Sequence, residues 1–360
     1  MKTFSFFVEP SQYTIDTIES IHKKLDIDFI FFNEMPLMSK AASENRFATL
    51  SNLKGWDRIR TLYTIWKNHD FFIFNGYDRW EFLLFFLAAT FANGRKYLAI
   101  ESDTQYRPVG GLKGALKRLY LRSVFSRPFV LGFAGGTGSH KDLFRRYGMG
   151  EDRIFLMPMM VNNERFQREE PRPAGPFTFL YVGRLIPHKN VAFALEAFVE
   201  AFKGHEDVLF RIVGDGESLD ALKKNFSHYA NVHFEGAKYG KELVHAYHTS
   251  HVLVIPSLYE PWGLVVNEAM AAGLPVLASD RVGAVGDLVK EGETGFVFDP
   301  LNKRQLSALM RTIHGDETSY ERLARNAQAL MKNHWNYELY RTNLVDAIDY
   351  VCRHLPKVSR

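Results

Sequence analysis

Two segments of the C-terminal half place glycine directly after predicted buried strands, and the first of them also carries positive charge. The first begins at Gly183, and its Arg184 and Lys189 offer two cations to one anionic group. Gly214 follows the next predicted strand, where it either lets a ligand approach the backbone or simply forms a turn. Because ligands of parallel sheets bind beyond the carboxyl ends of the strands, the first segment is a candidate anion site and the second a candidate ligand-binding loop.

A third segment, residues 256–276, is the most specific. Gly263 precedes a predicted helix that begins at Leu264, and the free N–H groups of such a helix start suit a pyrophosphate or sugar hydroxyls. Glu260 lies in the preceding loop, and Glu268 lies about one turn inside the helix, where its carboxylate could accept both hydroxyls of a ribose. The alternative for Glu268 is a capping or surface carboxylate; its apolar neighbours favour burial, which requires a partner.

Short apolar runs alternate with helical stretches along the whole chain, as in doubly wound α/β domains. In the first half the predicted strands are 4–8, 29–32, 71–74, 97–100 and 128–133, and the helices are 15–24, 56–67, 80–92, 112–125 and 140–147. In the second half the strands are 178–182, 208–213, 232–234, 252–255 and 275–278, and the helices are 192–202, 219–225, 242–248, 264–272 and 303–314. The stretch 319–354 is also predicted to be helical.

This rhythm predicts two domains, residues 1–168 and 169–335, with a Pro- and charge-rich linker at Gln167–Pro176. A C-terminal helix at about residues 336–360 could return to the first domain. The longest apolar run, Phe82–Ala92, covers only about half a bilayer and is expected to be a buried helix.

Composition points to a cytoplasmic protein that does not cross a membrane. The single cysteine, Cys352, fits a reducing compartment, and Glu9 interrupts the N-terminal apolar run too early for a signal peptide. Residues 1–168 hold 24 Lys and Arg against 17 Asp and Glu, a balance of +7, which leaves −3 for the remainder of the net +4. A basic first half indicates an anionic partner, such as a phosphate-bearing acceptor or a lipid surface, unless the charge is merely dispersed.

The predicted helix Leu112–Phe125 combines four cations with apolar side chains. It is either a peripheral contact with the inner face of a membrane or an ordinary surface helix. The only Asp-x-Asp pattern is Asp26-Ile27-Asp28, which we interpret as a strand edge and not as a metal site. No metal or other cofactor is expected, and no zinc spacing is present.

The run from Glu260 to Glu268 resembles the E-x7-E signature of family 4 glycosyltransferases, and Gly183–Lys189 resembles the family's GRL-x-x-x-K element. The resemblance covers about residues 177–299 with several motifs in order. It implies the GT-B architecture, two Rossmann-like domains facing across a cleft, and a metal-independent, retaining sugar transfer from a nucleotide-diphosphate sugar. The first domain would bind the acceptor and the second the donor.

The resemblance also implies roles for single residues. Arg184 and Lys189 would neutralise the leaving diphosphate, Glu260 would hold the sugar hydroxyls and Glu268 the ribose. The remaining donor-binding candidates are Gly183, Gly214, Trp262, Gly263, Leu264 and Val265, together with Lys238, which would border the base. Where many relatives have a histidine after the fourth strand this chain has 101–106, so Asp103, or else Glu101, would face the acceptor; a helix-capping carboxylate is the alternative.

The expected activity is that of a hexosyltransferase acting on a hydroxyl of a glycan or lipid-linked acceptor, in bacterial surface polysaccharide synthesis. The alternatives are a non-catalytic nucleotide-sugar-binding subunit, or a sugar phosphorylase or epimerase on the same scaffold. A non-catalytic relative would have lost the acids or the cations, whereas Arg184, Lys189, Glu260 and Glu268 are all present. Nucleic acid is not an expected partner.

Overall fold

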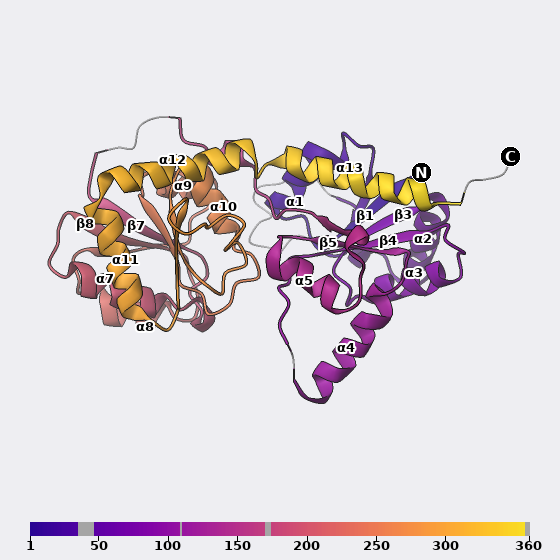
Figure 1. Cartoon of the computed structure of the whole chain (residues 1–360), viewed down its shortest axis with the longest axis horizontal. Coiled ribbons are helices and arrows are strands. Elements are labelled where there is room, and N and C mark those ends of the chain that lie inside the picture. Colours follow the sequence, from indigo (N-terminus) through magenta and orange to yellow (C-terminus); the bar gives the residue numbers. More distant parts are fainter. Residues whose placement is uncertain (35–46, 109, 170–173, 357–360) are drawn as a thin grey trace. The chain divides into compact units, whose positions relative to one another are not determined.

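The computed structural model describes residues 1–34, 47–108, 110–169 and 174–356 and divides the chain into two compact units (Figure 1). Unit 1 comprises Met1–Met160 and Tyr337–Arg360, and unit 2 comprises Val161–Asn336. The division therefore falls between residues 160 and 161, before the border expected at 168. The predicted linker Gln167–Pro176 lies within unit 2, and its residues 170–173 lie outside the described part of the chain.

Unit 1 is built on a parallel six-stranded sheet with the order β2-β1-β3-β4-β5-β6. Its apolar, Phe-rich runs form the central strands because both faces of a parallel sheet are covered. The strands are β1 (Thr3–Phe7), β2 (Asp28–Phe31), β3 (Phe71–Asn75), β4 (Tyr97–Ser102), β5 (Val130–Ala134) and β6 (Ile154–Leu156). Strand β6, which has only three residues, was not predicted from the sequence.

Helices cover both faces of this sheet. They are α1 (Gln12–Thr17), which continues as a π-helical turn at Ile18–His22, α2 (Gly55–Asn68), α3 (Trp80–Thr90), α4 (Gly111–Phe125), α5 (Gly138–Arg146) and α13 (Tyr337–His354). Buried side chains of α2, α3, α4 and α5 share one core with alternate strand residues such as Phe6 and Phe74. On the other face Ile18 packs with Phe7 and Phe31, and α13 contacts β6 and the π-helical turn.

Helix α3 corrects one expectation. Phe82, Phe85 and Ala89 are buried against the sheet, as expected for a core helix. Leu84 and Leu87 on its outer side are exposed, so the prediction that the whole run Phe82–Ala92 is buried was wrong. The run is apolar on all sides, and a single layer of helix can bury only the side that faces the sheet.

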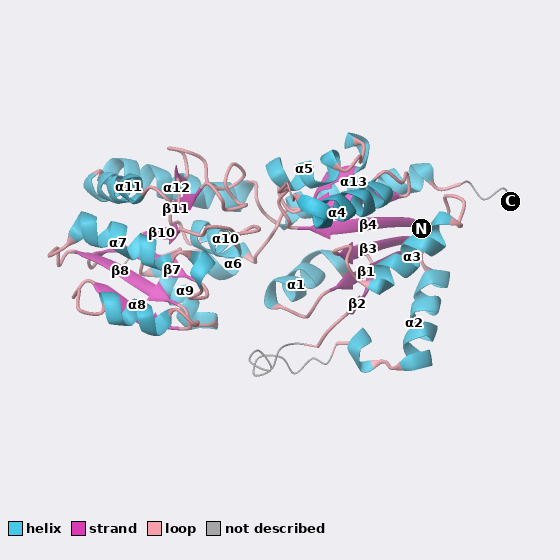
Figure 2. Ribbon diagram, turned by 90° about the horizontal axis from the view of Figure 1, so that it is seen from below, coloured by secondary structure: helices cyan, strands magenta, loops and turns pink. Residues whose placement is uncertain are grey.

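Unit 2 repeats the plan with the parallel order β12-β11-β10-β7-β8-β9 (Figure 2). Its strands are β7 (Phe177–Val182), β8 (Val208–Val213), β9 (Val232–Gly236), β10 (Val252–Ile255), β11 (Val276–Ser279) and β12 (Gly295–Phe298). The sequence analysis missed β12. The helices are α6 (Asn163–Phe166), α7 (Val191–Phe202), α8 (Leu219–Phe226), α9 (Gly240–His248), α10 (Leu264–Ala271), α11 (Lys303–Gly315) and α12 (Glu317–Asn333).

The strand order of unit 2 reverses between β7 and β10. From β7 the chain adds β8 and β9 on one side, and then crosses back to add β10, β11 and β12 on the other. Neighbouring strands whose connections leave in opposite directions open a crevice at their carboxyl ends, the usual ligand position in doubly wound sheets. The loops after β7 and β10 are therefore the place to look for a site.

Candidate nucleotide-sugar site and the unit 1 cavity

The loops that flank this reversal are joined by an ion pair between Lys189 and Glu260. Lys189 ends a short 3-10 turn after β7, and Glu260 lies in the loop after β10. Their side chains are only 14% and 13% exposed. A backbone bond from the N–H of Leu258 to the carbonyl of His188, at 2.8 Å, holds the two loops together. The structure thus brings together two residues that lie 71 positions apart and were assigned to one site by motif.

Arg184, the second cation of the motif, is exposed. It follows Gly183, the first residue after β7. The Gly183 carbonyl packs closely against Gly214, since a Cβ added to Gly214 would come within 1.9 Å of that oxygen. Gly214 also has φ +155°, so glycine is needed here both for space and for conformation. The loops after β7 and β8 are therefore stacked backbone to backbone, with Leu185 N–H donating to the Asp215 carbonyl at 2.8 Å.

Gly263 begins α10 in the left-handed region, with φ +97°. A Cβ there would approach the Glu260 side chain and Ile255 to 3.2 Å each. The following residues, Leu264 and Val265, occupy the first turn of α10, where backbone N–H groups point out of the helix end. This end of α10 is thus a place where an anion can be held beside Glu260 and Lys189.

The Trp262 side chain packs in the interior of unit 2. It is buried, its Nε1 donates to Oδ1 of Asn267 at 2.7 Å, and its ring stacks on Trp335 with centroids 5.4 Å apart. Its carbonyl accepts from the N–H of Ala284 at 3.1 Å. Any ligand contact predicted for Trp262 is consequently restricted to its backbone, and the indole serves to fix the loop.

Glu268 lies on α10 and accepts a hydrogen bond from the Tyr247 hydroxyl at 2.6 Å. Desolvation raises the pKa of its carboxyl from 4.5 to about 7, and the bond from Tyr247 and the charge of Arg165 oppose this rise. Tyr247 belongs to α9 and is fully buried, with a pKa raised well above 10 by burial and by Glu268. The sequence analysis missed Tyr247, because nothing near Glu268 in the chain indicates that α9 packs there.

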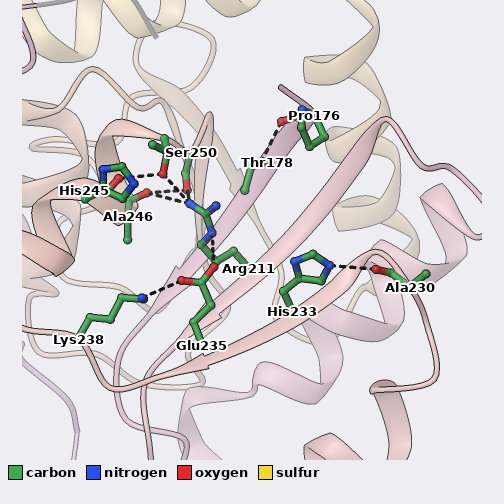
Figure 3. A network of polar contacts seen from close by, with 11 residues as sticks. Pro176, Thr178, Arg211, Ala230, His233, Glu235, Lys238, His245, Ala246 and Ser250 are labelled. Carbon is green, nitrogen blue, oxygen red and sulfur yellow. Dashed lines mark hydrogen bonds and ion pairs between the residues drawn. The ribbon is translucent and has the colours of Figure 1, made fainter. Parts of the chain in front are cut away.

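Lys238, expected to border a base, is part of a charged network at the end of β9 (Figure 3). Its Nζ lies 3.2 Å from Oε2 of Glu235, whose other oxygen is 2.5 Å from Nε of Arg211. Arg211 also donates to Thr249 at 2.7 Å and to Ser250 at 3.2 Å. The charge of Lys238 is thus partly balanced, and its contact with a base stays a prediction.

Unit 1 contains a cavity of about 480 Å³ at the carboxyl ends of β1, β3 and β4. Glu9, Asp78, Glu101 and Asp103 all line it, and none of its lining residues in the described part of the chain is Lys or Arg. Asp103, proposed from the sequence to face an acceptor, therefore lies at a cavity beside the reversal of strand order between β1 and β3. Its chemical role stays a prediction.

Glu101 is the most constrained carboxylate of this cavity. It accepts from Nδ2 of Asn75 at 2.5 Å and from the Tyr340 hydroxyl at 3.1 Å. Desolvation raises its pKa from 4.5 to about 7, while these two hydrogen bonds lower it. Tyr340 comes from α13, at the far end of the chain, and the sequence analysis missed both it and Asn75.

The Asp26-Ile27-Asp28 pattern stands at the start of β2. Oδ2 of Asp28 lies 2.8 Å from Nε2 of His69, so this carboxylate is paired with a side chain that lies just before β3. Within the residues that the structure describes, no group of three or more His, Cys, Asp or Glu side chains has the arrangement of a metal site. Over the same residues, no helix is both long and apolar enough to span a bilayer.

Two parallel doubly wound units define the GT-B class of fold. Residues 162–330, which lie within unit 2, match the family model described as glycosyl transferases group 1. Crystal structures of HepE from Anabaena are similar over 97% of this chain and all of HepE. The TM-score is 0.76 for the complex with UDP and 0.73 for that with UDP-glucose, at 17% and 18% identity, which speaks for the fold alone.

Curated relatives are similar in sequence to part of the chain. A glycogen synthase of Mycobacterium tuberculosis is 32% identical over 200 residues, 54% of this chain and 48% of the relative. A D-inositol 3-phosphate glycosyltransferase of Corynebacterium glutamicum is 26% identical over 270 residues, 69% of this chain and 62% of the relative. The chain thus spans about half to three fifths of the length of these curated relatives.

Proposed function

We propose that the protein is a retaining, metal-independent glycosyltransferase that takes its sugar from a nucleotide-diphosphate sugar bound by unit 2. The observation that carries the proposal is the Lys189–Glu260 pair beside the glycine-led start of α10, at the reversal of strand order. Here a cation and exposed N–H groups suit a diphosphate, and a carboxylate suits sugar hydroxyls. The match of residues 162–330 to glycosyl transferases group 1 supports it.

In the proposed reaction the bond from the anomeric carbon to the diphosphate breaks and a bond from that carbon to an acceptor hydroxyl oxygen forms. The hydroxyl proton passes to the leaving diphosphate oxygen on the same face of the sugar, which retains the anomeric configuration. Lys189 and Arg184 stabilise the charge that develops on the leaving group, and fixed cations do this without a metal ion. Glu268 holds the ribose, and Glu260 the sugar.

Unit 1 is the proposed acceptor-binding half, with the cavity around Asp103 and Glu101 as the acceptor site. A glycan or the sugar end of a lipid-linked acceptor fits a cavity lined by carboxylates, which accept hydrogen bonds from hydroxyls. We place the protein in the cytoplasm, in bacterial surface polysaccharide synthesis, with peripheral membrane contact through α4.

The first test is a thermal-shift screen of UDP-, GDP- and ADP-sugars, because a ligand that binds only the native state raises the melting temperature. The sugar that stabilises the protein is then incubated with enzyme, glycan acceptors and a chelator. Release of the nucleotide diphosphate, with an anomeric product of unchanged configuration by NMR, is the expected result. Stabilisation without turnover for any acceptor would instead identify a non-catalytic binding subunit, and inversion would exclude the retaining route.

A further inference from the structure

Exposed apolar side chains gather on three neighbouring helices of unit 1. Sixteen large hydrophobic residues of the described chain are exposed, and eleven of them lie between Trp56 and Leu119, on α2, α3 and α4 or on the residue that caps α3. Scattered exposed hydrophobic residues are normal, but such a concentration on adjacent elements marks an interaction surface. We call it the α2–α4 surface.

Each of the three helices contributes an outward stripe. On α2 the stripe is Trp56, Ile59 and Tyr63, and Trp56 is 83% exposed. On α3 it is Trp80, Leu83, Leu84 and Leu87, continued by the capping residue Phe91, which is 81% exposed. On α4 it is Leu112, Leu116 and Leu119, and Leu112 is 77% exposed. The spacing of three to four residues keeps the side chains of each stripe on one side of its helix.

The three helices cover the same face of the sheet. Their inward residues belong to one core cluster, which includes Leu62 of α2, Phe85 of α3 and Leu121 of α4. The rings of Trp66 on α2 and Phe85 on α3 pack with their centroids 5.3 Å apart. The Tyr120 hydroxyl of α4 donates a hydrogen bond of 2.6 Å to the backbone carbonyl of Tyr77, shortly before α3. The outward stripes consequently belong to neighbouring helices on one side of unit 1.

Positive charge surrounds these stripes. The exposed cations of the three helices and of the five residues on either side of each are Lys54, Arg60, Lys67, Arg95, Arg107, Lys113, Arg118, Arg122 and Arg127, and the exposed acids over the same described residues are Asp57 and Asp78. Helix α4 contains no Asp or Glu, Glu81 of α3 is buried and paired with Arg58, and α2 exposes only Asp57. Lys and Arg side chains next to Trp, Phe and Leu are the combination that binds the anionic headgroup layer of a bilayer.

The cavity of unit 1 does not account for this charge. Its lining in the described residues holds four carboxylates and neither Lys nor Arg. The excess of positive charge in the first half of the chain therefore lies outside the cavity, much of it around the apolar stripes. Of the two anionic partners considered from the sequence, a lipid surface fits this placement and a phosphate inside the cavity does not.

We propose that the α2–α4 surface docks onto an anionic lipid bilayer, with its Trp, Phe and Leu side chains at the headgroup–acyl boundary and its cations on the lipid phosphates. The contact extends beyond the basic helix α4 to α2 and α3, which supply most of the aromatic side chains. It is peripheral, because the stripes lie on the outer side of helices whose inner side packs on the sheet.

The experiment is sedimentation of the full-length protein with vesicles of phosphatidylcholine alone or with added phosphatidylglycerol, at low and high salt. The test variant is Trp56→Ser with Phe91→Ser, and the control is Leu301→Ser, an exposed apolar position in unit 2. We expect binding only to the anionic vesicles, a loss of about tenfold or more in partitioning for the double variant, and no loss for the control.

A charge variant, Lys113→Ser with Arg118→Ser and Arg122→Ser, should lose the salt-sensitive part of the binding. Tryptophan emission of the wild type should shift to the blue on anionic vesicles and become shielded from a soluble quencher. Circular dichroism and melting of each variant establish that it is folded. Failure of the folded wild type to sediment with anionic vesicles, or equal sedimentation of the double variant, overturns the proposal. A change in the double variant's oligomeric mass without lipid overturns it in favour of a second copy of the chain.

Discussion

Each unit carries a glutamate at the carboxyl edge of its sheet that accepts a hydrogen bond from a tyrosine hydroxyl. In unit 1 the pair is Glu101 and Tyr340, and in unit 2 it is Glu268 and Tyr247. Desolvation raises the pKa of both carboxyls to about 7. The surroundings differ: Glu101 shares its cavity with other carboxylates, whereas unit 2 places Lys189 in the loops at its edge.

The comparison shows how one architecture can be specialised by charge. Each of the two parallel sheets presents a carboxyl edge, and at each edge a glutamate accepts a hydrogen bond from a tyrosine. The cations and the glycine-led helix start of unit 2 then favour a ligand with negative charge, and the carboxylates of unit 1 favour one that offers hydroxyls. Five experiments can break or sharpen this contrast.

Replacing Lys189 by Ala should have the largest effect, a loss of about 100- to 1,000-fold in turnover, because it removes a cation from the leaving diphosphate. Lys203→Ala, at an exposed position after α7, is the matched control and should keep full activity. Combining Lys189→Ala with Glu260→Ala should cost less than the sum of the single losses, since the two side chains are partners. Steady-state kinetics with a donor saturation series measures both, and unchanged turnover for Lys189→Ala would refute its assigned role.

Gly214→Ala should destabilise the protein by about 3 kcal/mol, because the new Cβ would clash with the Gly183 carbonyl in a strained conformation. Gly236→Ala is the control: it shares a positive φ, but no atom lies within 4 Å of its Cβ. It should lose only about 1 kcal/mol. Urea unfolding compares the two, and equal losses would show that the tight stacking of the loops after β7 and β8 is unimportant for stability.

The raised pKa of Glu268 gives donor binding a pH dependence. In the proposed site the ionised carboxylate accepts the ribose hydroxyls, so affinity for the nucleotide should increase as the pH rises through about 7. Glu268→Gln should weaken binding about tenfold at pH 8 and flatten this profile. Glu101→Gln should change neither, because its cavity belongs to the other unit. Calorimetric titration of the nucleotide at pH values from about one unit below to about one unit above the pKa of Glu268 provides the measurement.

The raised pKa values of Glu101 and Glu268 also determine the direction in which the free energy of unfolding changes with pH. Both carboxyls have folded-state pKa values above 4.5, so each binds its proton more tightly in the folded than in the unfolded chain. Their contribution to the free energy of unfolding is therefore largest below about 4.5 and is lost as the pH rises to about 7. Either Gln variant should reduce this decline, and a steeper decline would contradict the assignment.

The smallest effect is expected for Tyr247→Phe and Tyr340→Phe, about 1 kcal/mol of stability each, because each removes one donated hydrogen bond. In both variants the pKa of the glutamate should rise further, since the bond lowers it. Tyr247→Phe should also shift the pH profile of nucleotide binding upward, whereas Tyr340→Phe should leave that profile in place. A shift caused by Tyr340→Phe would show that the two edges are not independent.

The sequence predicted most of the fold because apolar runs of four to six residues report strands that are buried on both faces. β6 was missed since Ile154–Leu156 has only three residues, and β12 since the apolar part of Gly295–Phe298 is a run of only three residues after a glycine. Local pattern also failed to predict the exposed side of α3, because an apolar run does not say which of its faces has a neighbour.

For the candidate site, motif spacing placed Lys189 and Glu260 in one region, and the structure joins them by an ion pair. Motif spacing could not identify Tyr247 and Tyr340, because their contacts with Glu268 and Glu101 depend on the packing of elements distant in sequence. Likewise, the interior role of the Trp262 indole depends on Trp335, which is distant in sequence.

Helix α13 returns to unit 1 after the chain has completed unit 2. A ribosome must therefore synthesise the whole of unit 2 before Tyr340 exists to bond with Glu101. Unit 2, which is continuous in sequence, can fold during synthesis, while unit 1 has to wait with part of its sheet uncovered. Unit 1 is thus the last part of the protein to mature, and shortening the chain before α13 should damage that unit first.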